Sequence, residues 1–449
     1  MHASLLNVQN RKERPLHVGL VGLGISTLAV YGFLKRSDTV FTVRDQRRAL
    51  PDGLLPDGIH RTLLGDGYLD HIDEDVLVLS PSVRPDLPML LAARARGVTV
   101  TTECEIFYTL FDGDLYAVTG SDGKSTTASI AHRLLLEGGC YTDPLLGGNI
   151  GTPLLSHLQR NAAPDAIVAE LSSFQLLHRT PHAKRALITN LTPNHLDVHS
   201  SLEEYYHTKL RLLSMAEEPV LNADDPTLCT HALRHNLYAV YGSEGAPLPR
   251  AEHTFIFSKE GIVRDGVLLL GAKMLSPFPP LFAKNLLAAI ALCDGKISCE
   301  TLSDTLSRLV PLPHRTETVR TVSGVCYVDS SADTTPSRTA ATLSQLGANV
   351  ILLAGGRGKG VTYDPILSSL PKVRHAVLYG ENREEIFEAL HTNGCPCTLT
   401  DTLSHAVSIA SMLAMSGDTV LLSPMSTSHD QYAGFHERGR DFQAAVWTL

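Results

Sequence analysis

A glycine-rich stretch in the first third of the chain has the residue types that bind phosphate. It reads Gly120-Ser121-Asp122-Gly123-Lys124-Ser125-Thr126. The glycines let a turn aim backbone N–H groups at an anion, the lysine can reach the outer phosphates, and the next hydroxyl can bind Mg²⁺. The general Walker spacing also requires a glycine at 118, where this chain has Val118. From the residues alone, an ordinary strand-to-helix turn therefore remains an alternative.

Four polar residues further along the chain are candidates for the same chemistry. Glu170 interrupts the apolar run 166–171, and a carboxylate inside a buried strand is costly unless it meets a cation or strong donors. Metal ligation is the most economical role for it. Asn149 follows two glycines and could face phosphate oxygens, although a plain loop explains it equally well. His195 and Lys209 are, on their own, more typical of surface positions.

Apolar patterning predicts the elements that position these residues. Residues 115–118 form a short apolar run, and 127–138 have apolar residues at helical spacing, so a strand and a helix flank the glycines. Ser201 to Glu204 form a capping box that predicts a helix over 202–215. Further apolar runs predict strands at 16–21, 39–43, 75–79, 166–171, 186–191, 220–225, 325–328, 350–353, 376–379 and 419–422. This alternation indicates an α/β protein with parallel sheets.

Three more segments have a local interpretation. Residues 146–151 are interpreted as a glycine-rich turn, 242–273 as a hairpin-rich insert, and 285–293 as an apolar core helix.

Near the N-terminus, the chain has a second nucleotide-binding pattern. Gly22 and Gly24 follow the first predicted strand, a helical stretch covers 26–35, and Asp45 ends the next strand. This is a βαβ opening with an acidic residue about 20 positions past the glycines. Thr27 stands where the dinucleotide fingerprint has its third glycine, so NAD is disfavoured against another nucleotide-bearing ligand.

Bulk composition excludes several classes of protein. A chain of 449 residues with 43% hydrophobic and 19% charged residues suggests roughly three globular domains. Its net charge of −9 disfavours nucleic acid as a partner. It has no secretory signal pattern and no apolar run of about 18 residues, so we expect a cytoplasmic protein without a membrane span. The eight cysteines have no short-spaced framework, and we expect them to be reduced.

In their order along the chain, these motifs resemble the Mur ligase family over essentially the whole sequence. The matching segments are the phosphate-binding loop, 148–151, 170–175, 190–192 with His195 and Asp197, His314-Arg315, and Asp329-Ser330. The loop fits the family's shorter pattern, Gly-Thr-Asn-Gly-Lys-Ser/Thr-Thr, with departures at Ser121 and Asp122, so Val118 is no longer an objection. The closing segment 423–439 resembles the branch of the family that adds D-glutamate.

The resemblance implies a fold, an activity and partners. It implies a Rossmann-like domain over 1–102 for a UDP-linked substrate, a P-loop ATPase-type domain over 103–311, and a second Rossmann-like domain over 312–449 for the amino acid. The implied reaction is an ADP-forming amide ligation in peptidoglycan synthesis. ATP would phosphorylate the carboxylate of UDP-N-acetylmuramoyl-L-alanine, and the amine of D-glutamate would displace the phosphate. A monomer that binds neither nucleic acid nor membrane is expected.

The resemblance also assigns residues to roles. Lys124, Glu170, His195 and Lys209 are the implied catalytic residues. Two Mg²⁺ ions are expected on Ser125, Glu170, His195 and Lys209, with Lys209 converted by CO₂ into a carbamate. ATP is expected to contact Gly120, Ser121, Asp122, Gly123, Lys124, Ser125, Thr126, Asn149, Arg315 and Asp329. The UDP group is expected at Ile25, Ser26, Asp45, Gln46, Arg47 and Ser80, and D-glutamate at Lys359, Ser428 and Phe435.

Two departures from the family pattern affect specific contacts. Leu281-Phe282 replaces a His-Asn pair, so the way adenine binds is open, and Asp333 replaces a threonine near the expected glutamate site. A carboxylate there would repel an anionic substrate unless it is turned away or paired. A sister Mur or folylpolyglutamate-type ligase that adds another amino acid is an alternative. A nucleotide-binding module without chemistry is a second.

Overall fold

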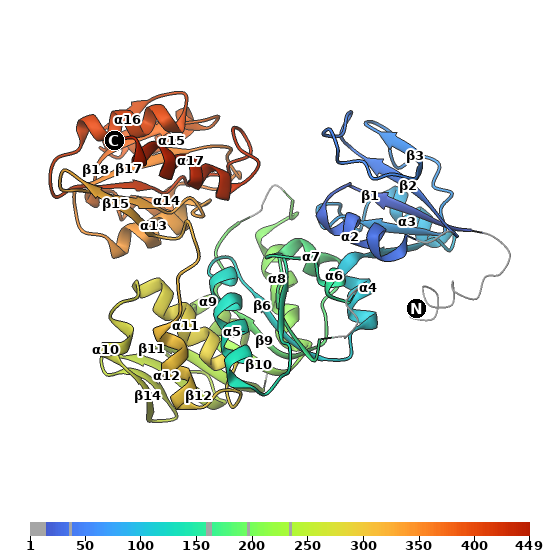
Figure 1. Cartoon of the computed structure of the whole chain (residues 1–449), viewed down its shortest axis with the longest axis horizontal. Coiled ribbons are helices and arrows are strands. Elements are labelled where there is room, and N and C mark those ends of the chain that lie inside the picture. The colour runs from blue at the N-terminus through green and yellow to red at the C-terminus, as the bar shows by residue number, and fades with distance from the viewer. Residues whose placement is uncertain (1–14, 36–37, 159–163, 195–197, 233–235) are drawn as a thin grey trace.

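The computed structural model describes residues 15–35, 38–158, 164–194, 198–232 and 236–449. Its strands form three separate sheets, and Figure 1 shows three lobes that follow one another along the chain. The predicted fold class, an α/β protein of three domains with largely parallel sheets, is confirmed.

The N-terminal lobe is built on a five-stranded sheet in the order β3-β2-β1-β4-β5, in which every neighbouring pair is parallel. Its elements are β1 (Leu16–Val21), α2 (Ile25–Leu34), β2 (Thr39–Asp45), β3 (Ile59–Leu64), β4 (Val76–Leu79), α3 (Pro88–Ala95) and β5 (Thr99–Thr102). Thr27, in place of the third fingerprint glycine, closes the glycine turn: its hydroxyl donates to Gly22 O at 3.0 Å and accepts from Gly24 N at 3.0 Å.

The central lobe has a nine-stranded sheet in the order β14-β13-β12-β11-β10-β9-β6-β8-β7. Its strands are β6 (Asp114–Thr119), β7 (Leu145–Gly148), β8 (Ala166–Glu170), β9 (Ala183–Ile188), β10 (Ala216–Asn222), β11 (Leu237–Ser243), β12 (Ala251–Ser258), β13 (Gly261–Arg264) and β14 (Val267–Gly271). In sheet order, all neighbouring strands between β7 and β12 are parallel, whereas β13 is antiparallel to both β12 and β14. β6 lies between β9 and β8, so its carboxyl end sits where ligands of open α/β sheets bind.

Helices cover the central sheet. They are α4 (Glu103–Leu110), α5 (Lys124–Gly138), α6 (Leu154–His157), α7 (Ser173–His178), α8 (Leu202–Ser214), α9 (Pro226–Ala232), α10 (Ala272–Leu275), α11 (Pro280–Leu292) and α12 (Cys299–Ser307). α5 and α11 pack against each other in the larger apolar core of this lobe, through residues such as Leu134 and Leu286. The helix that follows the phosphate-binding loop is thereby fixed on the sheet.

The C-terminal lobe contains a six-stranded sheet in the order β15-β16-β20-β17-β18-β19. Its elements are β15 (Glu317–Val322), β16 (Val325–Asp329), α13 (Pro336–Gln345), β17 (Val350–Gly355), α14 (Asp364–Leu367), β18 (Val373–Tyr379), α15 (Arg383–Thr392), β19 (Cys397–Leu399), α16 (Leu403–Leu413), β20 (Thr419–Leu422) and α17 (Phe435–Trp447). Only β15 runs antiparallel to its neighbour.

Several local predictions were wrong or incomplete. Residues 145–148 form the edge strand β7 rather than only a turn, because they pair in parallel with β8. The apolar helix begins at Pro280, five residues before the predicted start at 285, because a proline is favoured in the first turn of a helix. Patterning also missed β3, β5, β15 and β19, which are short or alternate weakly.

The N-terminal and central lobes share an apolar core. Val30 of α2, Ile106 of α4 and Leu154 of α6 belong to one buried cluster. A polar contact adds to it: Arg84 donates to both carboxylate oxygens of Glu204, at 3.1 and 3.2 Å, and to Val198 O at 2.8 Å. The predicted N-cap at Ser201 is present, but Glu204 turns to Arg84 and Ser200 N instead of completing a capping box.

The Arg84–Glu204 contact predicts a pH dependence of stability. Hydrogen bonds from Arg84 lower the pKa of Glu204 to about 2. Since the folded pKa lies below the ordinary value of about 4.3, the contact stabilises the fold above that value and its contribution is lost as pH falls toward 2. Between pH 5 and pH 3 we expect Glu204→Gln to lose about 1 kcal/mol less unfolding free energy than the wild type in urea titrations.

Glu217→Gln is the matched control, because it removes an exposed ion pair, with Lys184, at the amino ends of β9 and β10. An identical pH response of Glu204→Gln and the wild type would contradict the prediction.

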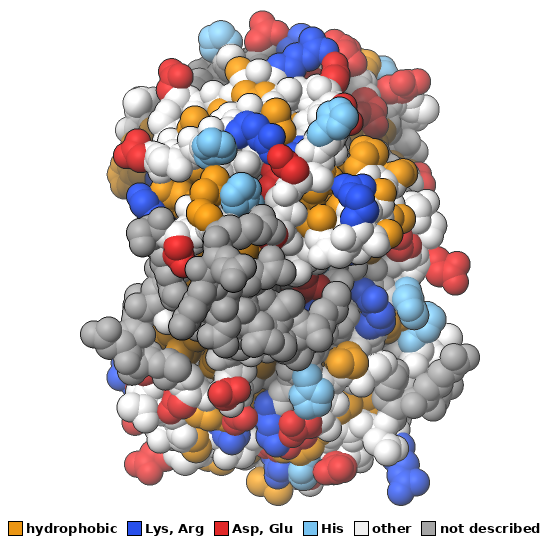
Figure 2. Space-filling model, turned by 90° about the vertical axis from the view of Figure 1, so that its right-hand side faces the viewer, with side chains coloured by type: hydrophobic (Ala, Val, Ile, Leu, Met, Phe, Trp, Pro, Cys, Tyr) orange, Lys and Arg blue, Asp and Glu red, His pale blue; other side chains and the backbone are white. Residues whose placement is uncertain are grey.

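No helix in the described part of the chain has the length and apolar character that crossing a membrane requires. On the face shown in Figure 2, acidic and basic side chains are interspersed.

Candidate active site

The phosphate-binding loop joins β6 to α5, as predicted, and its two glycines have backbone conformations that other residues rarely adopt. Gly120 has φ +145° and Gly123 has φ +82°. A Cβ on Gly120 would lie 1.9 Å from Thr189 Oγ1, and one on Gly123 would lie 2.5 Å from Asn285 Oδ1. Both positions therefore require glycine, and the loop forms a backbone turn at the N-terminus of a helix, which suits an anion.

The residues that follow β9 hold this loop from outside. Thr189 Oγ1 donates to Asp122 O at 2.5 Å, and Asn190 Oδ1 accepts from Asp122 N at 2.9 Å. Ser121 is also held: its hydroxyl donates to Thr192 O at 2.8 Å and lies 3.0 Å from the hydroxyl of Tyr205. The Ser121 side chain thus fixes the loop, and any nucleotide contact at this position would come from its backbone.

The strain at Gly120 gives a testable prediction. Gly120→Ala should destabilise the chain by about 2 kcal/mol or more, because it combines an unfavourable φ with a collision against Thr189. It should also abolish nucleotide binding in a titration. Gly139→Ala, at the C-terminal end of α5, is the matched control, since its φ is +68° but no atom lies within 4 Å of the new Cβ. Equal effects of the two substitutions would contradict the prediction.

Glu170 ends β8 beside the loop and is 1% exposed. Its Oε1 accepts a hydrogen bond from Asn149 Nδ2 at 2.8 Å, whereas its Oε2 is buried without a hydrogen-bond partner. A buried carboxylate oxygen left unpaired next to a phosphate site is the kind of donor that Mg²⁺ binds. The residues therefore fit a magnesium ion at this position, and the structure brings Asn149 and Glu170 together.

Lys209 lies in α8, where the residues alone favour a solvated surface lysine, yet it is 1% exposed. Its Nζ donates to Gly120 O at 2.9 Å and to Thr119 Oγ1 at 3.3 Å. Burial, reinforced by the charge of Lys124, lowers the pKa of Lys209 well below its ordinary value. The expectation of a surface lysine from the residues alone is wrong, and the role that the resemblance implies for Lys209, a carbamylated metal ligand, stays a prediction.

Lys124 begins α5, and its Nζ donates to Ser121 O at 2.9 Å. Burial lowers its pKa, and the cations Arg338 and Arg315 add to this effect, while Glu170 and Asp122 oppose it. Ser125 and Thr126 follow in the first turn of the same helix. His195 lies outside the residues that the structure describes, so its role stays a prediction.

A pocket of about 420 Å³ adjoins the loop, between the central and C-terminal lobes. It is lined by Asp122, Gly123, Asn190, Leu191, Thr192, Asn222, Asp224, Asp225, Pro226, Thr227, Leu281, Asn285, Ser337, Arg338 and Ala341. The lobes touch beside it, since Leu281 N donates to Gln345 Oε1 at 3.2 Å. The pocket has the size and the polar walls for a nucleotide.

Arg315 extends from the C-terminal lobe toward this region. Its guanidinium carbon lies 5.8 Å from the centre of the Phe435 ring. Burial and, to a lesser extent, the neighbouring cation Arg338 lower the pKa of Arg315 to about 10, although Glu170 opposes the shift. Arg315 and Glu170 therefore act on one another across the two lobes.

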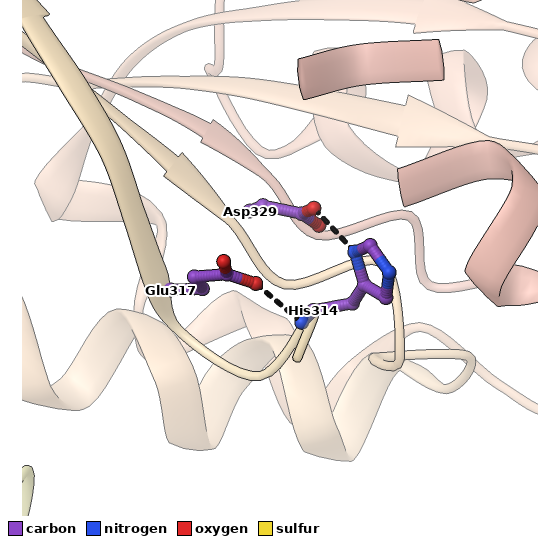
Figure 3. A group of neighbouring side chains, drawn as sticks. All are labelled: His314, Glu317 and Asp329. Carbon is purple, nitrogen blue, oxygen red and sulfur yellow. Dashed lines mark hydrogen bonds and ion pairs between the residues drawn. The ribbon is translucent and has the colours of Figure 1, made fainter. Parts of the chain in front are cut away.

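Asp329 is hydrogen-bonded within its own lobe (Figure 3), and its predicted contact with the nucleotide stays a prediction. Its Oδ2 lies 2.7 Å from His314 Nδ1 and accepts from Gln443 Nε2 at 2.9 Å, and its Oδ1 accepts from Ser331 N at 2.9 Å. Glu317 accepts a hydrogen bond from the backbone N–H of His314 at 2.8 Å.

His314, Glu317 and Asp329 offer ligand atoms within 4.8 Å of one another, as a metal site would. Gln443 Nε2, however, also donates to Glu317 Oε2 at 3.3 Å, so an amide already serves both carboxylates. We interpret the group as a hydrogen-bond network that fixes the backbone next to Arg315. His314 there has φ +60°, which is strained for a residue other than glycine.

The three residues predicted to hold D-glutamate all lie in the C-terminal lobe. Lys359 Nζ donates to Thr334 Oγ1 at 3.1 Å, Ser428 is 2% exposed, and the backbone oxygen of Phe435 accepts from Ser331 Oγ at 2.8 Å. Their contact with an amino acid stays a prediction.

A second pocket, of about 550 Å³, lies at the carboxyl edge of the N-terminal sheet. Four of the residues predicted to hold the UDP group line it: Asp45, Gln46, Arg47 and Ser80. Burial opposes ionisation of Asp45, but hydrogen bonds from Arg47 and from Leu23 N outweigh it and lower its pKa. Ile25 and Ser26 begin α2 beside the pocket but are not among its lining residues, and Ile25 is 68% exposed.

Comparison with known proteins gives this arrangement a family. The model of the Mur ligase middle domain matches residues 118–293, and that of the Mur ligase glutamate ligase domain matches residues 314–425. UDP-N-acetylmuramoylalanine–D-glutamate ligase of Symbiobacterium thermophilum is 35% identical over 450 residues, which cover 96% of this chain and 97% of that protein. The ligase of the same name from Acetivibrio thermocellus is 34% identical and covers 99% of both chains. The chain belongs to the Mur ligase family.

Solved structures support the fold of this Mur ligase. UDP-N-acetylmuramate–alanine ligase of Thermotoga maritima superposes with a TM-score of 0.57 at 17% identity, over 96% of this chain and 99% of that one. A pseudomurein peptide ligase of Methanothermus fervidus gives a TM-score of 0.56 at 17% identity, over 91% and 96% of the two chains.

Two features of this Mur ligase were not recognised as site features from the sequence. Asn285, assigned to a core helix, accepts from Thr127 Oγ1 at 3.4 Å and lines the pocket beside Leu281. Arg338 was not singled out, although it lines the same pocket. Asp333 was expected to repel an anionic substrate unless its carboxylate was turned away or paired. It is fully buried and paired with Arg338, at 2.9 Å, so the second of these conditions is met.

Proposed function

We propose that this Mur ligase joins D-glutamate to UDP-N-acetylmuramoyl-L-alanine with consumption of ATP, forming ADP and phosphate. The observation that supports it most is the match, at 32 to 35% identity over almost the whole of both chains, to relatives named for this reaction. The pocket between the lobes and the phosphate-binding loop supply an environment for it.

ATP, with Mg²⁺, supplies the phosphoryl group that turns the acceptor carboxylate into an acyl phosphate, a species that an amine can attack. The protein's own part is positioning and charge neutralisation, which dominate phosphoryl transfer. Lys124 and the backbone N–H groups of the loop would hold the outer phosphates. Glu170 Oε2, buried and unpaired, would hold a Mg²⁺ ion beside them, and Ser125 at the start of α5 would be a second ligand.

A second Mg²⁺ ion, on His195 and a carbamate of Lys209, is a finer part of the proposal. The depressed pKa of Lys209 favours its neutral amine, which is the form that reacts with CO₂. A carbamate there would replace the neutral amine with an anionic oxygen ligand.

The pairing of Asp333 removes an objection to a diacid substrate. Its two oxygens are occupied by Arg338, Thr342 and Ser423, so it does not present a free carboxylate to an incoming anion. Lys359 is the cation proposed to bind the side-chain carboxylate of D-glutamate. The proposed division of labour assigns the acceptor to residues 1–102, ATP to 103–311 and the amino acid to 312–449.

Phosphate release with UDP-N-acetylmuramoyl-L-alanine, measured with D-glutamate, L-glutamate, L-lysine or diaminopimelate, tests the proposal. We expect turnover with D-glutamate at least about a hundredfold above each of the others, because a substrate with differently placed charged groups leaves polar groups of the site unpaired and its transition state is bound more weakly. Turnover with L-lysine alone would favour a sister ligase, and ATP binding without turnover on any substrate would favour a binding module.

A further inference from the structure

Arg338 lies in the first turn of α13 and lines the pocket that adjoins the phosphate-binding loop. Its Nε donates to Asp333 Oδ1 at 2.9 Å and lies 3.8 Å from Asp122 Oδ1 of the loop. The side chain is 17% exposed, so the guanidinium is part of the pocket wall and does not extend into solvent. It comes from the C-terminal lobe, whereas the loop belongs to the central one.

Asp333 fixes the position of this arginine. It is fully buried, and its Oδ2 accepts hydrogen bonds from Thr342 Oγ1 at 2.7 Å and Ser423 Oγ at 2.9 Å. Because Oδ1 is held by Arg338 Nε, the carboxylate has little freedom to rotate. An arginine anchored at Nε retains two terminal amino groups for a second anion.

Those terminal groups are available. Within the described residues, no hydrogen bond to Nη1 or Nη2 of Arg338 is recorded, and the only further ion pair, with Asp122, is longer than a hydrogen bond. Asp122 and Gly123 of the loop line the same pocket. An anion bound on the loop would thus meet the free face of the guanidinium.

We propose that Arg338 binds the phosphate groups of ATP, so that the C-terminal lobe supplies a cation to the phosphate-binding loop when the lobes are together. The inference rests on the proposed function, because it takes ATP to be the ligand of this pocket. Lys124 follows Asp122 and Gly123 in the loop, so two cations from two lobes, Lys124 and Arg338, lie beside one anion site. A polyphosphate could accept hydrogen bonds from both cations, whereas a role in the ion pair with Asp333 alone would leave the terminal groups of Arg338 unused.

The test is a calorimetric titration of the full chain, with Mg²⁺, using a non-hydrolysable ATP analogue and, separately, adenosine. Arg338→Gln should weaken the analogue by about 10- to 100-fold and leave adenosine unchanged, and Arg338→Lys should restore part of the loss. Arg374→Gln is the matched control, since it breaks another arginine pair with a buried aspartate, Asp418, at the amino ends of β18 and β20 in the same lobe. It should leave both affinities unchanged.

Two further variants separate phosphate binding from other roles. If Arg338→Gln leaves Asp333 unpaired and unfolds the chain, the double variant Asp333→Asn/Arg338→Gln removes both charges and should show the same selective loss. Gln345→Ala removes another contact between the lobes, the hydrogen bond from Leu281 N: if Arg338 acted only by holding the lobes together, Gln345→Ala would weaken the analogue as Arg338→Gln does, whereas phosphate binding by Arg338 predicts no such loss.

Equal weakening of analogue and adenosine by Arg338→Gln, or an equal loss of analogue affinity in Gln345→Ala, would overturn the inference. A wild-type chain that binds the analogue but turns over no amino acid would instead overturn the proposed function, and the effect of Arg338 would still be measurable.

Discussion

Lys124→Met is expected to lower the rate of ligation about a thousandfold while leaving the fold intact. Its ammonium is the loop's own cation, held at Ser121 O, and in the proposed reaction it would lie where charge develops on the transferred phosphoryl group. The methionine keeps the length of the side chain, and the lost hydrogen bond to Ser121 is a single one. Steady-state phosphate release and a thermal unfolding midpoint measure the two effects.

Lys184→Met is the control for Lys124→Met. Lys184 lies at the amino end of β9, where it pairs with Glu217 on the surface, away from the loop. It should keep the wild-type rate. A Lys124→Met rate within tenfold of the wild type would show that the loop does not stabilise the transferred phosphate through this residue.

Lys209→Ala is expected to lower the rate of ligation about as much as Lys124→Met. Unlike the loss in Lys124→Met, this loss should be partly reversed by small carboxylate anions. A carbamate on Lys209 would supply an anionic ligand, so formate or acetate should recover part of the activity if either enters the cavity that alanine leaves. With ¹³C-labelled bicarbonate, the wild type should give a carbamate carbon resonance that the variant lacks.

The alternative role for Lys209 is structural: it would hold the loop in place through its hydrogen bonds to Gly120 O and Thr119 Oγ1. Under that role, Lys209→Ala would lose activity without rescue by any carboxylate and without loss of a labelled resonance. Activity that is unchanged in Lys209→Ala would exclude both roles.

The sequence predicted those parts of the site that depend on local chain geometry. Gly120 and Gly123 stand between an apolar run and a helical pattern, and Glu170 stands out because a carboxylate in an apolar strand needs a partner. The strands that carry them are buried on both faces, so their apolar runs are continuous and easy to recognise. The resemblance added Lys209, which its helical pattern alone would have placed in solvent.

The remaining parts could not be predicted because they depend on contacts between distant segments. Asp122 and Arg338 are 216 positions apart by their numbers and meet only because α13 packs against the loop of another lobe. Asp333 was ambiguous for the same reason: its burial and its three partners, from α13 and from the end of β20, are set by the tertiary fold. Neither composition nor periodicity records such a contact.

In the proposed reaction, three sites on three lobes act together. The pocket at the carboxyl edge of the N-terminal sheet is assigned to the acceptor, the loop to ATP, and the C-terminal lobe, which supplies the cation Arg338, to the amino acid. We propose that the acceptor carboxylate is activated by phosphorylation before D-glutamate attacks.

The most direct test follows an oxygen atom. UDP-N-acetylmuramoyl-L-alanine labelled with ¹⁸O at both carboxylate oxygens is incubated with ATP, Mg²⁺ and D-glutamate, and the phosphate formed is examined by mass spectrometry. Because a carboxylate oxygen attacks the γ-phosphorus and leaves with it when the amide forms, we predict one ¹⁸O in each phosphate released. Phosphate without ¹⁸O, or labelled phosphate that forms with L-lysine and not with D-glutamate, would contradict the account.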